Sequence, residues 1–304
     1  MRLDCRLFIS KFFLFFLIVV FGSCSTINNK KTSCQLSKEE KADLDYLLRF
    51  LLFESYGSFV LFGSKPLCEM EFVDTEVTQA ERQKRLQAMS IEERAQYEAE
   101  AEKLKAEGLL VQMNFERNLF DGWKVIEKIR PDIKKYLIIA HPLEYPGVYS
   151  LFLVDILKTA FVLEENYEVF KKAVEMDFDP LKIVFEIENS DSVFWKRVFD
   201  LGNHEAKGLL FGFGKKNALF YEWEAAYENT QGHLAEFVKS VSFKPTAERT
   251  LPLGKDGPDN FTIPIFGTLD DQEIVEKYEK EKKDIEKIYR GKDLVEVTLQ
   301  KLLQ

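Results

Sequence analysis

The segment 204–217 (HEAKGLLFGFGKKN) combines glycines and lysines in an order that could bind a phosphate. A phosphate-binding loop needs four residues between its glycines, then Lys and a Ser or Thr. Here five residues separate Gly208 from Gly214, and Lys216 stands at the hydroxyl position. A dinucleotide fingerprint would need a third glycine at Asn217 and a surrounding βαβ unit, which the pattern lacks. The segment therefore predicts no nucleotide binding, but a short helix that glycines end.

The histidines and serines also match no metal-binding or catalytic motif. His141, His204 and His233 lie far apart, and the residue four positions after His204 is Gly208 rather than the second histidine of a zinc-protease helix. No serine lies in a Gly-x-Ser-x-Gly turn, and carboxylates are so abundant that no acid/base pair stands out. We therefore predict no catalytic residue, no metal and no cofactor.

The start of the chain has the three parts of an export signal. A basic segment precedes an apolar run over residues 12–21, and two small residues follow that run. At about 1.5 Å per residue, such a run is too short to cross a hydrocarbon core of about 30 Å. Residues 1–23 are therefore predicted to be a cleaved signal peptide.

Phe21-Gly22-Ser23-Cys24 resembles the bacterial lipobox, in which Leu usually stands where Phe21 is. The resemblance implies that the Cys24 thiol receives a diacylglyceryl group and that cleavage makes Cys24 the new N-terminus. A bulky residue three positions before the cleavage site also disfavours an ordinary secretory cut. Ser25, where Asp would favour the inner membrane, favours the outer membrane. The alternatives are a normally secreted protein and an uncleaved anchor.

The other cysteines form a candidate pair. Cys5 leaves with the signal peptide and Cys24 carries the lipid, so Cys34 and Cys68 remain. An oxidising compartment permits a disulfide between them, which would join the tether to the first β-segment. Two free thiols are the alternative, because the sequence does not show whether the two Cα atoms lie within about 4.4–6.8 Å.

Length and charge exclude some partners. Removal of residues 1–23 takes away Arg2, Arg6, Lys11 and Asp4, so the formal charge of −9 becomes −11. Such an acidic chain is unsuited to nucleic acid. The 27 phenylalanines predict a folded domain with a large core rather than a disordered chain.

The apolar pattern predicts an α+β fold, a helix-rich domain around a small, mainly antiparallel sheet with charged helical arms. Residues 24–36 are a polar tether, and residues 37–240 form the globular domain. Ser37 and Glu40 make a capping box that opens its first helix. Residues 59–62 and 68–73 are expected to form a β-hairpin.

Residues 75–108 have a different composition, rich in charged residues and poor in large apolar ones. Ser90 and Glu93 supply a second capping box within them. A solvated helical hairpin, inserted in the globular domain, is the expected structure. The alternative is a protruding arm that recruits a partner.

Paired strands are predicted at residues 136–140 and 148–154, followed by a long helix over residues 155–176. Further helix caps are predicted at Asp179, at Ser190 or Asp191, and at Asn203. Trp123, Trp195 and Trp223 could line a groove for a sugar or peptide, but they lie on apolar helix faces and are expected in the core.

The last part of the chain divides at residue 268. Residues 241–268 are predicted to be an irregular connection, and residues 269–304 amphipathic helices that Thr268 caps. One apolar stripe is expected on these helices, made of Ile274, Tyr278, Ile285 and Ile288.

Three stretches carry a resemblance to a known family. They are residues 59–66 (FVLFGSKP), residues 204–218 (HEAKGLLFGFGKKNA) and residues 263–299, from IPIFG through EKYEKEKKDIEKIYRGKDLVEVTL. Together they are similar to uncharacterised lipoproteins of chlamydia-like intracellular bacteria. The resemblance implies a cell-envelope location and brings no activity, ligand or catalytic residue.

Two functions remain open. The first is a non-catalytic, lipid-anchored envelope protein, tethered to a membrane through Cys24, that binds or braces an envelope or host protein. The alternative is a lipid-anchored hydrolase that acts on cell-wall material. A concave pocket with convergent carboxylates or two histidines would favour the hydrolase, and an apolar patch on a packed surface would favour the binding protein.

Overall fold

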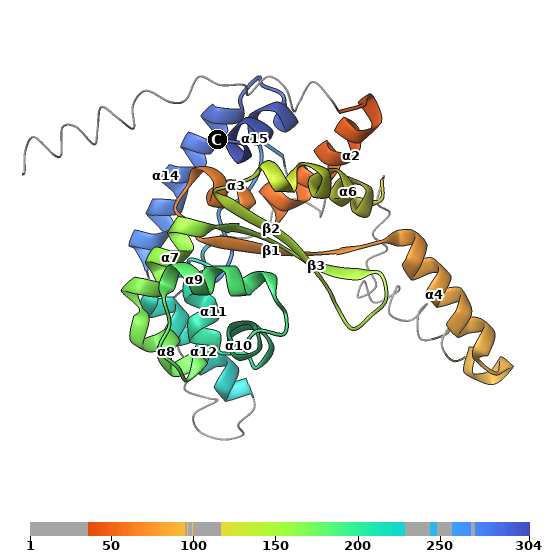
Figure 1. Ribbon diagram of the computed structural model, residues 1–304, viewed down its shortest axis with the longest axis horizontal. Helices are drawn as coiled ribbons and strands as arrows, with labels where there is room; N and C mark the ends of the chain where they lie inside the picture. The colour runs from red at the N-terminus through yellow and green to blue at the C-terminus, as the bar shows by residue number, and fades with distance from the viewer. Residues whose placement is uncertain are drawn as a thin grey trace, which may run out of the picture. The chain divides into compact units, whose positions relative to one another are not determined.

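Among the described residues, a three-stranded antiparallel sheet lies between two layers of helices (Figure 1). Its strands are β1 (Leu67–Val73), β2 (Tyr136–Pro142) and β3 (Val148–Asp155), in the order β1-β3-β2. β3 is the central strand and pairs with both neighbours over its whole length. The predicted α+β fold with an antiparallel sheet is confirmed.

The computed structural model describes residues 36–94, 96, 99, 117–228, 244–247, 257–268 and 271–304. Leu36–Gln304 form one compact unit. Two hydrophobic cores are built from the described residues of this unit. The predicted signal peptide and nearly all of the predicted tether lie outside the described residues.

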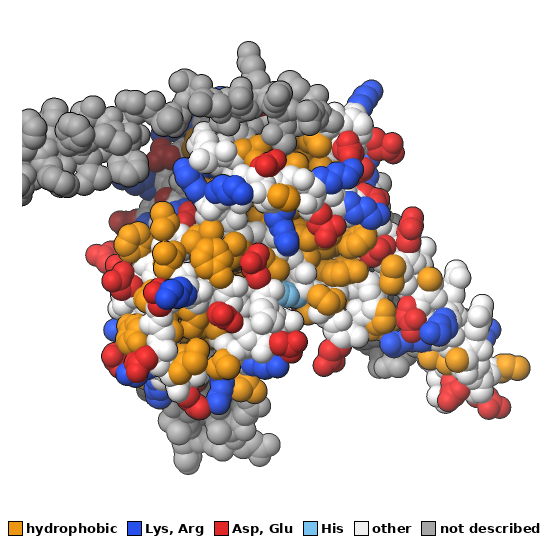
Figure 2. All heavy atoms as spheres, in the orientation of Figure 1, with side chains coloured by type: hydrophobic (Ala, Val, Ile, Leu, Met, Phe, Trp, Pro, Cys, Tyr) orange, Lys and Arg blue, Asp and Glu red, His pale blue; other side chains and the backbone are white. Residues whose placement is uncertain are grey.

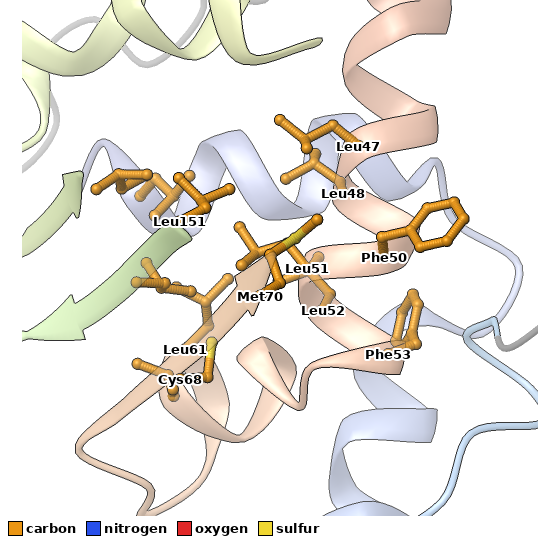
Figure 3. Close-up of a cluster of buried hydrophobic side chains, with 14 of the residues drawn as sticks. Leu47, Leu48, Phe50, Leu51, Leu52, Phe53, Leu61, Cys68, Met70 and Leu151 are labelled. Atoms are coloured by element: carbon orange, nitrogen blue, oxygen red, sulfur yellow. The ribbon is translucent and has the colours of Figure 1, made fainter. Parts of the chain in front are cut away.

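One face of the sheet packs against the first and last helices of the described part of the chain. Cys68 and Met70 of β1 and Leu151 of β3 point among the leucines of the first helix and the turn that follows it (Figure 3). The elements of this layer are α2 (Lys38–Arg49), the π-helical turn η2 (Phe50–Glu54), α3 (Gly57–Phe62), α6 (Leu119–Ile129), η3 (Arg130–Asp132), α14 (Gln272–Tyr289) and α15 (Leu294–Leu302). The C-terminal helices therefore complete the core that the first helix begins.

The opposite face packs against the middle of the chain. Leu137, Phe152 and Val154 alternate with the residues of the first face and contact this second layer, as the two-residue period of a strand requires. Its elements are α7 (Ile156–Glu165), α8 (Tyr167–Val174), α9 (Pro180–Val184), η4 (Phe185–Glu188), α10 (Val193–Trp195), η5 (Lys196–Asp200), α11 (His204–Leu210) and α12 (Lys215–Glu228). Because helices cover both faces, apolar residues of the strands are buried on both sides of the sheet.

The charged insertion begins as α4 (Thr75–Ala88), which has no buried residue and extends beyond the end of β1 (Figure 1). Asp74 caps it, and the Arg85 guanidinium lies 4.6 Å from the Tyr145 ring centroid. The Ser90–Glu93 capping box is present. The predicted solvated helix is confirmed for this part of the insertion, and most of residues 95–108 lie outside the described residues.

The predicted hairpin of residues 59–62 and 68–73 is wrong. Residues 59–62 belong to α3, and β1 pairs with β3 instead. A run of four apolar residues has no period that separates a strand from a buried helix. Phe59, Val60 and Leu61 are all buried, and a helix satisfies their backbone groups internally where no strand partner is available.

Three boundaries also differ from the predictions. The helix over residues 155–176 is interrupted at Asn166, which separates α7 from α8. Ser192, rather than Ser190 or Asp191, caps α10. Asp271 caps α14, because Thr268 belongs to β5 (Gly267–Thr268), which pairs with β4 (Lys244–Pro245).

The caps at Ser37, Asp179 and Asn203 are confirmed. In α14 the predicted Tyr278 and Ile285 are buried, but Tyr289 rather than Ile288 completes the buried stripe.

Candidate functional site

The cysteines that the sequence singles out are not brought together within the described residues. Cys24 and Cys34 lie outside them, so the lipid and the disulfide stay predictions. Cys68 lies on β1 with 1% of its surface exposed and has no disulfide partner among the described residues. Burial raises the pKa of the Cys68 thiol to about 12, which keeps it protonated and unreactive at neutral pH.

The described histidines make separate contacts. His141 of β2 is buried, and its Nε2 atom lies 2.8 Å from the Ile187 carbonyl oxygen, an acceptor that requires a proton on this nitrogen. Its ring lies 4.2 Å from the Trp195 ring, whereas His204 faces Tyr221. His233 lies outside the described residues. Within the described part of the chain, no group of three metal-ligating side chains could hold an ion.

Sequence reasoning missed a polar cluster on the second face of the sheet. The Ser150 hydroxyl donates to a Glu69 carboxylate oxygen at 2.6 Å, and Lys207 of α11 lies 4.0 Å from the other oxygen of Glu69. His141 is the cross-strand neighbour of Ser150. Only the strand register brings these residues together, because Glu69 and Ser150 are 81 positions apart.

This cluster contains the residue types of a hydrolase, but its serine is 2% exposed. A nucleophile must reach a substrate carbonyl, and the buried Ser150 side chain already donates its hydroxyl proton to Glu69. The contacts instead satisfy buried polar groups and join α11 to β1 and β3. The cluster therefore acts as a structural link between the sheet and the second helical layer.

A second unpredicted feature surrounds Lys65. Its side chain is 2% exposed, and its ammonium group donates to the Phe211 carbonyl oxygen and lies 5.3 Å and 5.9 Å from the Phe211 and Phe213 ring centroids. Burial lowers the pKa of Lys65 to about 8, although the nearby Cys68 acts in the opposite direction. Phe213 in turn stacks on Phe266 at 4.6 Å.

Three stretches that are distant in sequence, residues 59–66, 204–218 and 263–299, therefore meet in space. Lys65 comes from the first, Phe211 and Phe213 from the second, and Phe266 from the third. The Tyr278 hydroxyl, also from the third, donates to the Gly212 carbonyl oxygen at 2.7 Å. Lys65 is enclosed on all these sides, so this junction holds the fold together rather than exposing a reactive amine.

Four exposed apolar side chains lie on two neighbouring segments of the second helical layer. Leu157 and Phe161 of α7 are 61% and 62% exposed, and Leu181 and Phe185 of α9 and η4 are 48% and 46% exposed. Each pair has the i,i+4 spacing that places two side chains on one face of a helical segment. α7 packs against α9. We call these four residues the α7–α9 face, and Figure 2 shows hydrophobic side chains gathered over these helices.

These four side chains do not attach the helices to the core. Other residues attach the two helices to the core, namely Ile156, Thr159 and Leu163 of α7 and Ile183, Val184 and Ile187 of α9 and η4. The sequence does not show which apolar residues of the two helices face the core and which are exposed, because both helices carry apolar residues on both sides.

The tryptophans do not form a groove within the described residues. Trp123 and Trp195 are buried as predicted, and the prediction is wrong for Trp223, which is 48% exposed.

No helix among the described residues has the length and apolar content needed to cross a membrane. Comparisons of the chain with protein-family models, with curated proteins and with solved structures found no match.

Proposed function

We propose that this chain is a lipid-anchored, non-catalytic cell-envelope protein that binds another envelope or host protein. The α7–α9 face is the observation that carries the proposal. The lipobox-like residues before Cys24 support the cell-envelope location. The enclosed positions of Ser150, His141 and Cys68 fit a binding role better than catalysis.

The face has the chemistry of a binding anchor. Fully burying an exposed Leu or Phe side chain contributes about 1.5–3 kcal/mol, and a few such residues dominate the energy of most protein interfaces. Leu157, Phe161, Leu181 and Phe185 are adjacent in pairs and held on helices that the core fixes. A partner could bury all four without rearranging the fold.

Site-specific crosslinking tests the binding role. A photo-reactive residue at Phe161 or Phe185, in cells that produce the chain naturally, should crosslink one and the same protein. Leu201, which is 71% exposed and lies outside the α7–α9 face, is the matched control position and should not crosslink that protein. Equal products from Leu201, or none from the face, would contradict the proposal.

Lipid attachment is tested separately. Wild type grown with a fatty-acid analogue should carry the label and sediment with membranes. The Cys24→Ala variant should lose the label, and no cleaved form of it should sediment with membranes. Cys5→Ala is the matched control, because Cys5 lies within the predicted signal peptide, and it should label as wild type does. Equal labelling of Cys24→Ala and wild type would remove the lipid claim.

A further inference from the structure

The α7–α9 face is bordered by carboxylates. Glu164 and Glu165 follow Phe161 by three and four positions on α7, so they lie beside it on the same side of the helix. Glu186 follows Phe185 directly, and Glu188 comes three positions after it in a 3₁₀ turn, where residues three apart eclipse. All four glutamates are exposed.

These charges are not neutralised by the fold. None of Glu164, Glu165, Glu186 and Glu188 forms an ion pair with another described residue, whereas Lys158 and Lys182, which lie beside the four apolar residues in sequence, each pair with an aspartate. Lys158 lies 2.9 Å from Asp155, and Lys182 lies 3.7 Å from Asp179. The border beside Phe161 and Phe185 is therefore negative. At the other end of α7, beside Leu157, Lys158 and Lys135 are charged neighbours of Lys301.

The charges around the α7–α9 face favour some binding partners over others. A second copy of the chain would bring the same glutamates against each other, and like charges brought together at an interface are unfavourable. An anionic lipid surface would be repelled for the same reason. A partner with basic residues around an apolar stripe matches both the centre and the border.

The spacing indicates the shape of that partner. The face offers two pairs of side chains at i,i+4 on neighbouring helical segments, and α7 is about 15 Å long. An amphipathic helix can lay its own apolar positions across such a surface. We propose that the partner segment bound at the α7–α9 face is a basic amphipathic helix. This inference rests on the proposed function and specifies the chemistry of its partner.

Two synthetic helices of about 18 residues test the inference, long enough to exceed α7. Both have the same leucine stripe, and the remaining positions are all lysine in one and all glutamate in the other. Binding is measured by fluorescence anisotropy to the chain from Ser25 onward, which contains the whole compact unit. We expect the lysine peptide to bind at least about tenfold more tightly than the glutamate peptide, and to weaken as salt rises from about 0.05 M to about 0.3 M.

The variant Leu157→Ser/Phe161→Ser should reduce binding of the lysine peptide about tenfold or more, because it removes two anchors. Leu201→Ser, at an exposed leucine elsewhere, should leave it unchanged. Glu164→Lys/Glu186→Lys should reverse the preference between the two peptides. Because all changed side chains are exposed, thermal unfolding should show the same fold in each variant.

Several outcomes would overturn the inference. They are equal binding of both peptides, binding that Leu157→Ser/Phe161→Ser leaves unchanged, self-association through the face, or binding to phosphatidylcholine vesicles that depends on Leu157 and Phe161 in place of peptide binding. Crosslinking from Phe161 to a protein whose contacting segment is not basic would leave the proposed function intact and reject only the basic helix.

Discussion

Substitution of Gly122 by Val is expected to lower the free energy of unfolding by about 3 kcal/mol, because α6 crosses α2 at this glycine with no room for a side chain. A Cβ atom at Gly122 would lie 2.6 Å from the Asp43 carbonyl oxygen and 2.6 Å from the Leu47 Cβ atom. One of these atoms is backbone and the other is fixed to it. The two helices would therefore have to move apart.

Chemical denaturation of the chain measures this effect as a lower midpoint with an unchanged slope. Lys124→Val is the matched control, since it introduces the same branched residue on the exposed side of the same helix. It should change stability by less than about 1 kcal/mol. A Gly122→Val variant as stable as Lys124→Val would show that the helices do not pack this closely.

This crossing illustrates what the sequence reveals and what it does not. The period of Trp123, Val125 and Ile126 predicts an amphipathic helix, and all three are buried. The same period gives no sign that Gly122 contacts α2, because that contact depends on where a distant helix lies. Local signals such as the capping box of Ser37 with Glu40 are predicted correctly, since their hydrogen bonds join residues three apart.

Long-range pairing explains the missed features. Residues 59–62 were expected in a strand, but β1 finds its partner in β3, and this choice follows from the packing of the whole sheet. The Glu69–Ser150 hydrogen bond depends on the same register. For the α7–α9 face, composition shows that Leu157 and Phe161 are apolar, but only the fold shows which side of α7 meets the core.

Lys65 was another residue whose environment could not be anticipated, because Gly63-Ser64-Lys65-Pro66 has the composition of an exposed turn. The loop that covers Lys65 comes from residues about 146 positions later in the chain. The amine is enclosed by Phe211 and Phe213, and among the described residues it pairs with a carbonyl oxygen and with no carboxylate. The burial of this charged amine should lower the stability of the folded protein at neutral pH.

Substitution of Lys65 by Met should stabilise the protein at pH 7 and lose that advantage at higher pH. Burial lowers the pKa of Lys65 from 10.5 to about 8, which corresponds to a cost of about 3 kcal/mol for folding with the charged amine. Met fills similar space without charge but leaves the Phe211 carbonyl oxygen unpaired, at a cost of about 1–2 kcal/mol. The expected net gain at pH 7 is about 1–2 kcal/mol.

The sign of the pH dependence follows from proton binding. Below pH 8 the amine is charged in both the folded and the unfolded chain, so the whole cost is present. Between pH 8 and 10.5 the unfolded chain binds more protons than the folded one, so wild-type stability rises with pH. Cys68 acts in the opposite direction above pH 9, because burial raises the pKa of its thiol from 9.0 to about 12.

The wild-type rise should therefore be clearest between pH 8 and 9, before ionisation of the unfolded thiol opposes it. Denaturant unfolding at steps across this interval should show a rise in wild type and none in Lys65→Met. Lys172→Met, at an exposed lysine of α8, should retain the wild-type rise. Because Lys65→Met keeps Cys68, the difference between the two curves isolates the amine. Parallel curves for wild type and Lys65→Met would mean that this lysine reaches water in the folded protein.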